Sequence, residues 1–270
     1  MLFYLAIFFE GIMLSSIGPV LPELRDRTGS TLGAIGIVFT ANSLGYILGS
    51  LASGRSFGRF PGNPVLAASL VWTAAVVALI PFVGVIWLLV VAFAAFGFAL
   101  GFIDVGTNTL IVWVFRSDVP PYMNALHLSF AIGAFASPLI IDRFAVLNGD
   151  ATTAYWLFAA LMLPLAIALL RHESPAPPAA ASDAPSGSVL RRYALFLGLM
   201  ALFFFMHVGA ELAFGGWIFS YADEIGLGND TTGRVLNSLF WGGLVLGRLL
   251  AIPLSMRLSS RSMIPVSYTH

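Results

Sequence analysis

The chain has no cysteine and no lysine, and it carries little charge of either sign. The absence of cysteine excludes disulfides, thiolate metal sites and cysteine nucleophiles. Charged residues make up 10% of the 270 residues, whereas about 25% is usual for a soluble domain. Hydrophobic residues make up 59%, and the mean hydropathy is +0.92. A soluble protein of this length would lack the polar surface to cover its core, so the composition predicts a polytopic membrane protein.

Several functional classes are also excluded. The formal net charge is zero, so no basic surface points to a nucleic-acid partner. The sequence contains no Walker loop, no HExxH motif and no GxSxG motif. We therefore expect no enzyme activity, no cofactor and no metal site, and we expect the lipid bilayer as a partner.

Eight apolar segments are long enough to cross about 30 Å of hydrocarbon as helices. The first begins at the N-terminus, but it has no basic region or small-residue cleavage site and contains Glu10, so we interpret it as a span and not a secretory signal. The fold class is therefore all-α membrane. The expected helices are 2–21, 31–53, 64–83, 86–115, 124–144, 154–171, 193–221 and 232–256.

The segments between the spans indicate the topology. Short turns are expected at 61–64, 120–121 and 148–150, and the Pro-, Ala- and Ser-rich stretch 172–192 is typical of a flexible linker. If the spans alternate, eight arginines lie on the side of this linker and four on the other side. The excess predicts a multi-pass protein of the cell membrane with the linker in the cytoplasm. The eight are Arg55, Arg59, Arg116, Arg171, Arg191, Arg192, Arg257 and Arg261, and the four are Arg25, Arg27, Arg143 and Arg234.

An internal repeat divides the chain. The motif GYILGSL at 45–51 matches GLVLGRL at 243–249 with an offset of 198, and glycines at 11 and 18 match glycines at 209 and 216. Parallel repeats of six helices are a feature of major facilitators. We therefore expect a first repeat at 1–171, a cytoplasmic linker at 172–192 and the start of a second repeat at 193–270. Because twelve spans need roughly 400 residues at about 20 apolar residues each, a fragment with a foreign tail at 266–270 is expected. The alternative is a natural end with association of two copies.

Ionisable groups inside apolar spans are candidates for function, because each costs at least roughly 2.5 kcal/mol to insert. Asp104 and Asn108 lie four residues apart and share a helix face, with Gly97 and Gly101 nearby to allow close helix approach. This pair can bind a sugar hydroxyl or take up a proton. The alternative is a structural hydrogen bond to a neighbouring helix.

A second group lies in the segment 193–221. Glu211 precedes the glycine pair 215–216, which can break the helix, and Trp217 and Tyr221 share a stripe beyond it. An aromatic face can stack on a sugar ring, although both aromatics can also belong to an interfacial belt. Glu10 is either a second protonatable site or a packing contact.

Two further ionisable side chains lie in the spans 124–144 and 232–256. His127 follows Asn124 by three residues and is either a binding residue or a structural donor. We assign Arg248 a structural or gating role.

The motifs together are similar to those of the fucose–galactose–glucose symporter family of the major facilitator superfamily. The resemblance rests on GFIDVGTN at 101–108, NALHLSFAIGA at 124–134, the residues from Val208 to Glu211 with Trp217 and Tyr221, and Gly247 with Arg248. It implies import of a hexose or deoxyhexose with H⁺ or Na⁺, and it implies that Asp104 handles substrate or proton.

The sequence departs from this family at two places. Where proton-coupled members carry an acid, four residues before the proline that is Pro22 here, this chain has Gly18, which leaves sodium or another acid open. The basic loop of the superfamily is reduced to GRSFGR at 54–59, with Arg55 and Arg59 in gating or structural roles.

The resulting hypothesis is a secondary sugar importer that works by alternating access. We expect Asp104, Asn108, Asn124, His127, Glu211 and Trp217 to face a crevice between the repeats. One alternative is a major facilitator exporter of drugs or metabolites. An alternative of another class is a membrane sensor or assembly protein that transports nothing.

Overall fold

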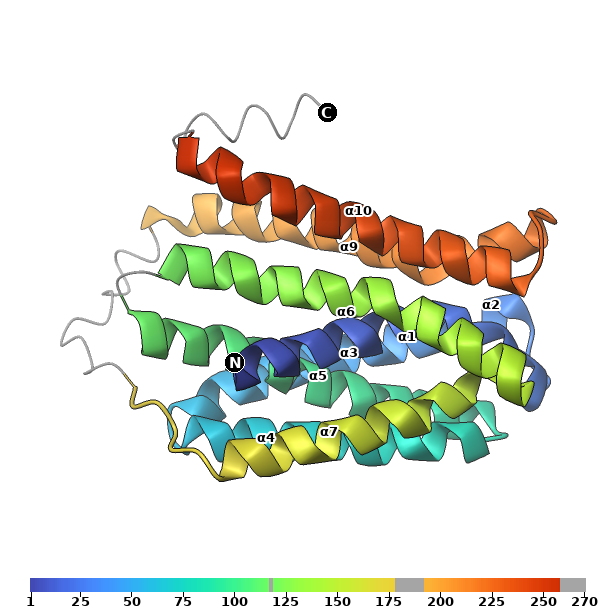
Figure 1. Cartoon of the computed structure of the whole chain (residues 1–270), viewed down its shortest axis with the longest axis horizontal. Helices are drawn as coiled ribbons and strands as arrows, with labels where there is room; N and C mark the ends of the chain where they lie inside the picture. Colours follow the sequence, from blue (N-terminus) through green and yellow to red (C-terminus); the bar gives the residue numbers. More distant parts are fainter. Residues whose placement is uncertain (117–118, 178–191, 258–270) are drawn as a thin grey trace.

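The computed structural model describes residues 1–116, 119–177 and 192–257, with side chains described up to residue 250. The described residues form a bundle of long helices without a strand among them (Figure 1). The helices are α1 (Leu2–Thr28), α2 (Leu32–Ile35), α3 (Ile37–Phe57), α4 (Gly62–Leu79), α5 (Ile86–Phe115), α6 (Val119–Asn148), α7 (Ala154–Leu170), α9 (Ala194–Glu224) and α10 (Asp230–Arg257). Short 3₁₀ turns, η1 (Ile80–Phe82) and η2 (Ala151–Thr153), follow α4 and precede α7.

Seven helical segments within the described ranges are long and apolar enough to cross a membrane. They correspond to the first seven expected spans. The eighth expected span forms α10, which is helical where predicted but is not among the seven. The outer faces of the membrane-spanning helices carry large apolar side chains such as Leu48, Trp87 and Leu195, all more than half exposed. An apolar exterior of this extent is unsuited to water and suits lipid, so the all-α membrane fold is confirmed.

Three expected boundaries were wrong. The first helix does not end at residue 21, because α1 continues through Pro19 and Pro22 to Thr28. The expected turn at 120–121 is the first turn of α6, where prolines are tolerated because the amide hydrogens there have no intrahelical partner. Likewise, α4 already begins at Gly62, inside the expected turn 61–64. The turn at 148–150 is confirmed, with Gly149 at φ 71°.

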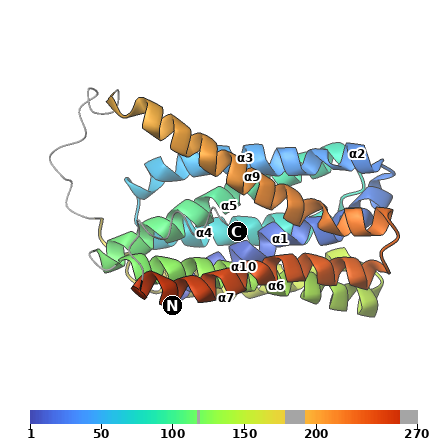
Figure 2. The same ribbon diagram turned by 90° about the horizontal axis from the view of Figure 1, so that it is seen from above.

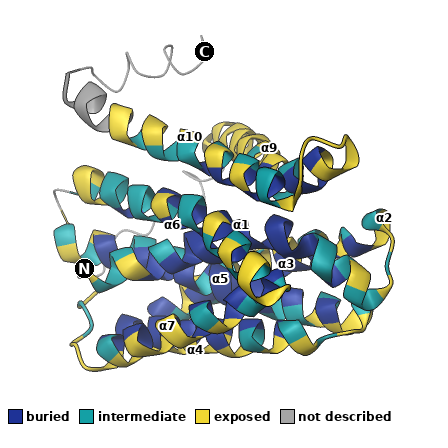
Figure 3. Cartoon of the chain, turned by 45° about the vertical axis from the view of Figure 1, so that its right-hand side comes forward, coloured by how far each residue is buried: buried dark blue, intermediate teal, exposed yellow. Residues whose placement is uncertain are grey.

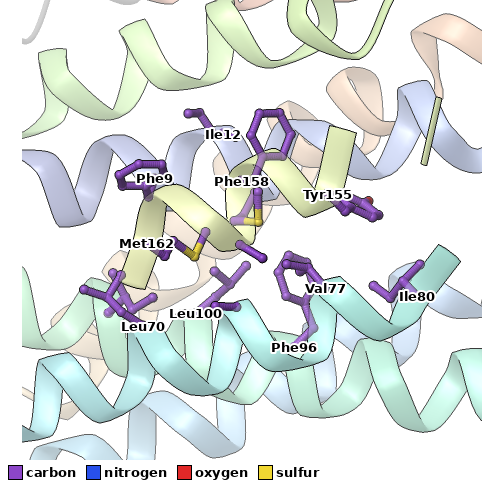
Figure 4. Close-up of a cluster of buried hydrophobic side chains, with 14 of the residues drawn as sticks. Phe9, Ile12, Leu70, Val77, Ile80, Phe96, Leu100, Tyr155, Phe158 and Met162 are labelled. Carbon is purple, nitrogen blue, oxygen red and sulfur yellow. The ribbon is translucent and has the colours of Figure 1, made fainter. Parts of the chain in front are cut away.

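The main apolar core lies between α1, α4, α5 and α7 (Figure 4). Phe9 and Ile12 of α1 meet Phe158 and Met162 of α7, while Leu100 of α5 closes the opposite side. The helices α9 and α10 lie against α1 and α6 on the far side of the bundle from α4 and α7 (Figure 1).

Small residues bring the helix backbones together. A Cβ at Gly97 of α5 would overlap the carbonyl of Asn42 on α3, and a Cβ at Gly101 would overlap the carbonyl of Tyr46. The expectation that these two glycines allow close helix approach is therefore confirmed. The α3–α5 contact is the most extensive among the described helices and places Tyr46 beside Asp104.

The helix α9 is continuous from Ala194 to Glu224, so the expected break at the glycine pair was wrong. Glycine at these positions serves close packing instead. A Cβ at Gly18 of α1 would press on the carbonyl of Gly216, and a Cβ at Gly215 would meet the ring of Trp241. By contrast, residues 192–210 are exposed throughout, and α9 runs obliquely to α10 (Figures 2 and 3).

The expected division into repeats 1–171 and 193–270 stays a prediction, because most of the linker lies outside the described residues.

Candidate functional site

The carboxylate of Asp104 is held by two neutral donors. The hydroxyl of Tyr46 on α3 donates to Oδ2, and Asn108, one turn further along α5, donates to Oδ1 over 2.8 Å. Both carboxylate oxygens therefore have a partner, and the shared helix face expected for Asp104 and Asn108 forms a direct hydrogen bond. Asp104 itself is half-buried.

A second carboxylate lies beside this group. Glu10 of α1 is 3% exposed, and its Oε2 has no hydrogen-bond partner among the described residues. It is close enough to interact electrostatically with both Asp104 and Tyr46. Burying a carboxylate without a partner is expensive, so such groups at this depth mark sites of function in membrane proteins.

Polar groups extend from this centre to the later helices. Asp104 interacts electrostatically with His127 of α6, His127 with Arg248 of α10, and Arg248 with Glu211 of α9. We call the groups Glu10, Asp104, His127, Arg248 and Glu211 the polar chain. It links α1, α5 and α6 of the expected first repeat to α9 and α10 of the second. His207 of α9 also interacts with Glu211.

A crevice of about 380 Å³ lies between α1, α3, α9 and α10. Trp217 of α9 and Phe39 of α3 form part of its wall, with ring centroids 5.2 Å apart and planes tilted by 44°. The lining residues are Leu14, Ile17, Phe39, Thr40, Asn42, Ser43, Leu44, Gly209, Leu212, Ala213, Gly216, Trp217 and Trp241.

Two polar groups in the crevice wall are buried without a partner. Asn42 is 6% exposed and its Oδ1 accepts no hydrogen bond from the described residues. Trp241 of α10 is 2% exposed and its Nε1 has no acceptor among them. An unpartnered buried acceptor and an unpartnered buried donor indicate a place where a ligand or water completes the hydrogen bonding.

The expected site residues are therefore placed in different surroundings. Of the six expected to face the crevice, Trp217 lines it, while Asp104, Asn108, His127 and Glu211 belong to the polar chain or contact it. Asn124 is half-buried near one end of α6, one turn before His127. The remaining expected residues lie near helix ends and are exposed: Tyr221, Arg55 and Arg59.

Sequence reasoning missed Tyr46, Asn42 and Trp241. A signal for two of them was present, because Asn42 and Tyr46 are polar groups four residues apart in an apolar helix. Trp241 gave no such signal, since a tryptophan inside an apolar span is equally typical of packing between helices.

Sequence reasoning also gave no role to Arg234, which is 2% exposed and lies where α10 begins. It contacts Glu23 of α1 over 2.7 Å and Asp142 of α6 over 3.6 Å. Its guanidinium also lies 5.3 Å from the ring centre of Phe219 on α9. Arg234 thus joins α10 to α1, α6 and α9 at one end of the bundle.

Across the described residues, no cluster of three or more His, Asp or Glu side chains could hold a metal ion.

The arrangement of apolar spans around a polar chain and a crevice is typical of a membrane transporter. The chain matches the family model of the Major Facilitator Superfamily over residues 3–269, and it belongs to that family. It is a transporter and not an enzyme.

The relatives agree with this assignment. The chain is 28% identical to "Sodium-dependent glucose transporter 1A" of Mus musculus, with 98% of this chain and 70% of the relative covered. It is 27% identical to "Sodium-dependent glucose transporter 1" of Homo sapiens, with 95% and 56% covered. It is 25% identical to "Major facilitator superfamily domain-containing protein 4A" of Mus musculus, with 97% and 70% covered. The chain thus spans little more than half the length of the human glucose transporter that it matches.

Proposed function

We propose that this protein is a secondary active importer of a hexose or deoxyhexose, of the fucose, galactose or glucose class, which moves with H⁺ or Na⁺ by alternating access. The observation that carries the proposal is the polar chain. Charged groups within apolar spans are tolerated where they border a water-accessible path for substrate or ion. Similarity to proteins named as sodium-dependent glucose transporters supports the sugar as cargo.

In this proposal the polar chain couples the two repeats. The carboxylates of Glu10 and Asp104 belong to the expected first repeat, and Arg248 and Glu211 belong to the second. A cation that binds at Asp104 changes the charge that His127 and Arg248 experience, because opposite charges attract strongly where water is scarce. The relative position of the two helix groups then depends on whether cation and sugar are bound.

The proposed topology follows from the same repeats. The repeats 1–171 and 193–270 are joined by the linker 172–192 in the cytoplasm, and the protein resides in the cell or inner membrane. A protease added to inside-out vesicles is then expected to cut at 172–192, whereas right-side-out vesicles protect that segment.

Uptake of labelled hexoses into vesicles tests the function. The protein is reconstituted, and an inward gradient of Na⁺ or of H⁺ is imposed separately. We expect accumulation of at least one hexose above its external concentration with one of the two cations. The same assay on Asp104→Asn is expected to lose accumulation, while Asp26→Asn, at a carboxylate that is 70% exposed, retains it.

Absence of accumulation for every hexose with either cation would reject the proposal. Efflux of amphipathic drugs in place of hexose uptake would favour the alternative function, an exporter of drugs or metabolites.

A further inference from the structure

We infer that a groove between α3 and α4, on the outside of the bundle, binds one anionic phospholipid, with an acyl chain in the groove and the phosphate at Arg55 and Arg59. This inference goes beyond the proposed function. We call this place the outer groove. It holds about 220 Å³ and is lined by Ser56, Phe60, Val65, Ala68, Ser69, Trp72, Phe98, Ala99 and Phe102.

The outer groove exists because α3 and α4 both pack on α5 and make few contacts with each other. The helix α5 supplies the floor between them. The indole of Trp72 reaches from α4 to α5, where its Nε1 donates to the carbonyl of Ala95 over 2.9 Å. Phe60 and Trp72 of the lining are more than half exposed, so the groove opens to the surroundings of the bundle. In a membrane, lipid chains therefore have free access to it.

The lining favours a hydrocarbon chain. Its side-chain donors, Ser56, Ser69 and Trp72, each already donate to a backbone carbonyl. None of the lining residues has an unpartnered buried polar atom, so an apolar ligand leaves no polar group unsatisfied.

The size of the outer groove also favours such a chain. A volume of about 220 Å³ lies below the roughly 300–1,000 Å³ typical of small-molecule sites. It is also too small for a partner's helix, which is about 10 Å across. A single acyl chain is narrow enough to enter.

Two arginines lie where the outer groove reaches the end of α3. Arg55 directly precedes Ser56, Arg59 directly precedes Phe60, and both arginines are exposed. The backbone amides of Arg59 and Phe60 donate to the carbonyl of Ser56, which folds this turn back onto the end of α3. Neither guanidinium forms an ion pair with a carboxylate of the described residues. Two unpaired cations beside an apolar groove complement the phosphate and the acyl chain of one lipid.

The outer groove lies at the end of the bundle from which the linker leaves. Asn63, in the first turn of α4, donates to the carbonyls of His172 and Glu173. The proposed topology puts this end at the cytoplasmic leaflet, where anionic lipids are concentrated. A lipid in the groove fills the space between α3 and α4 and holds α3 on α5, the pair of helices that carries Tyr46 and Asp104.

The test measures lipid binding to the purified full chain in a neutral detergent. Phosphatidylglycerol and phosphatidylcholine with the same acyl chains are titrated in, bound lipid is counted by native mass spectrometry, and the melting temperature is followed. We expect one phosphatidylglycerol to bind saturably and to raise the melting temperature, because a ligand that binds only the folded state stabilises it. Phosphatidylcholine, which has no net charge, is expected to bind about tenfold more weakly. Glycerol 3-phosphate, which has no acyl chain, is expected not to bind.

The double substitution Arg55→Gln with Arg59→Gln removes the two charges. It is expected to raise the concentration of phosphatidylglycerol for half-saturation about tenfold, to that of phosphatidylcholine. The matched control is Arg143→Gln, which removes an exposed arginine of α6 near the opposite end of the bundle and is expected to leave binding unchanged.

The substitution Ala68→Trp fills the outer groove and is expected to abolish binding of phosphatidylglycerol. The matched control is Ala75→Trp, at an exposed position two turns further along α4 that is not part of the lining. If Ala68→Trp fails to fold, the arginine variant and the comparison of the two lipids decide the question.

Equal binding of the two phospholipids would overturn the inference. So would binding of phosphatidylglycerol that stays unchanged in the arginine variant or in a folded Ala68→Trp protein. These measurements need no gradient and no sugar, so they are independent of the transport assay. Selective lipid binding by a chain that accumulates no hexose would support the outer groove and reject the proposed function, whereas accumulation without selective lipid binding would do the reverse.

Discussion

At the scale of the residue, the most informative group is Asp104 with its two donors. Hydrogen bonds to a charged acceptor are worth about 1.5–3 kcal/mol, roughly twice those between neutral groups. Tyr46 and Asn108 thus hold the carboxylate in one orientation toward the helices around it. Glu10, by contrast, has no donor on Oε2 among the described residues.

The substitution Tyr46→Phe removes only the hydroxyl that donates to Asp104. We expect gradient-driven hexose uptake to fall by about tenfold or more, because the carboxylate loses a charge-assisted hydrogen bond. The control is Tyr122→Phe, where the ring is stacked on Phe115 near a helix end, and uptake is expected to stay normal. Equal uptake by both variants would show that the Tyr46 hydroxyl has no role.

At the scale of the element, the helices are long apolar segments held together by backbone contacts at glycine. Lipid gives no hydrophobic drive for two helices to associate, so close packing of small residues takes its place. Gly97 against Asn42 is such a contact, and the same contact fixes the position of Asn42 at the crevice.

We therefore expect Gly97→Leu to lower the melting temperature of the purified protein, because the side chain would overlap the carbonyl of Asn42 and overpacking costs about 1–3 kcal/mol. Gly198→Leu on α9 is the matched control, since an added Cβ there has no neighbour within 4 Å. Thermal unfolding followed by circular dichroism compares the two. A Gly97→Leu protein as stable as Gly198→Leu would contradict the packing argument.

The elements also show what a single sequence can and cannot predict. Long apolar segments predicted the helices because each span must satisfy its own backbone hydrogen bonds. The spacing of Asp104 and Asn108 predicted that they share a helix face, because residues four apart on one helix are neighbours. Tyr46 is 58 residues from Asp104, and only the packing of α3 on α5 brings them together. Gly215 and Gly216 were misjudged because glycine serves both helix breaks and close contacts, and the sequence does not distinguish them.

At the scale of the whole molecule, Arg234 joins the first and the last of the described helices, α1 and α10. The guanidinium is buried, while Glu23 and Asp142 are 22% and 18% exposed at their side chains. Loss of one partner from a buried ion pair leaves the other charges uncompensated, so this contact holds α10 against α1 and α6. Alternating access would require it to separate when this end opens.

The substitution Arg234→Gln is therefore expected to loosen the packing of α10 against α1 and α6 at this end of the bundle. A cysteine introduced by Ser220→Cys, at a buried serine of α9, is expected to react about tenfold faster with a thiol reagent in this variant, within the usual range of conformational coupling. The control is Arg27→Gln, which breaks a pair with Asp150 inside the expected first repeat. Unchanged reactivity with Arg234→Gln would show that the contact does not close this end.

The central claim is that buried carboxylates couple a cation gradient to sugar movement. Its most direct test compares gradient-driven accumulation with sugar exchange at equal cation concentrations, in wild type, Glu10→Gln and Asp104→Asn. The account predicts that at least one variant keeps exchange but loses accumulation, because sugar still binds while the cation no longer does. Full accumulation by both variants, driven by the same gradient as in wild type, would contradict the account.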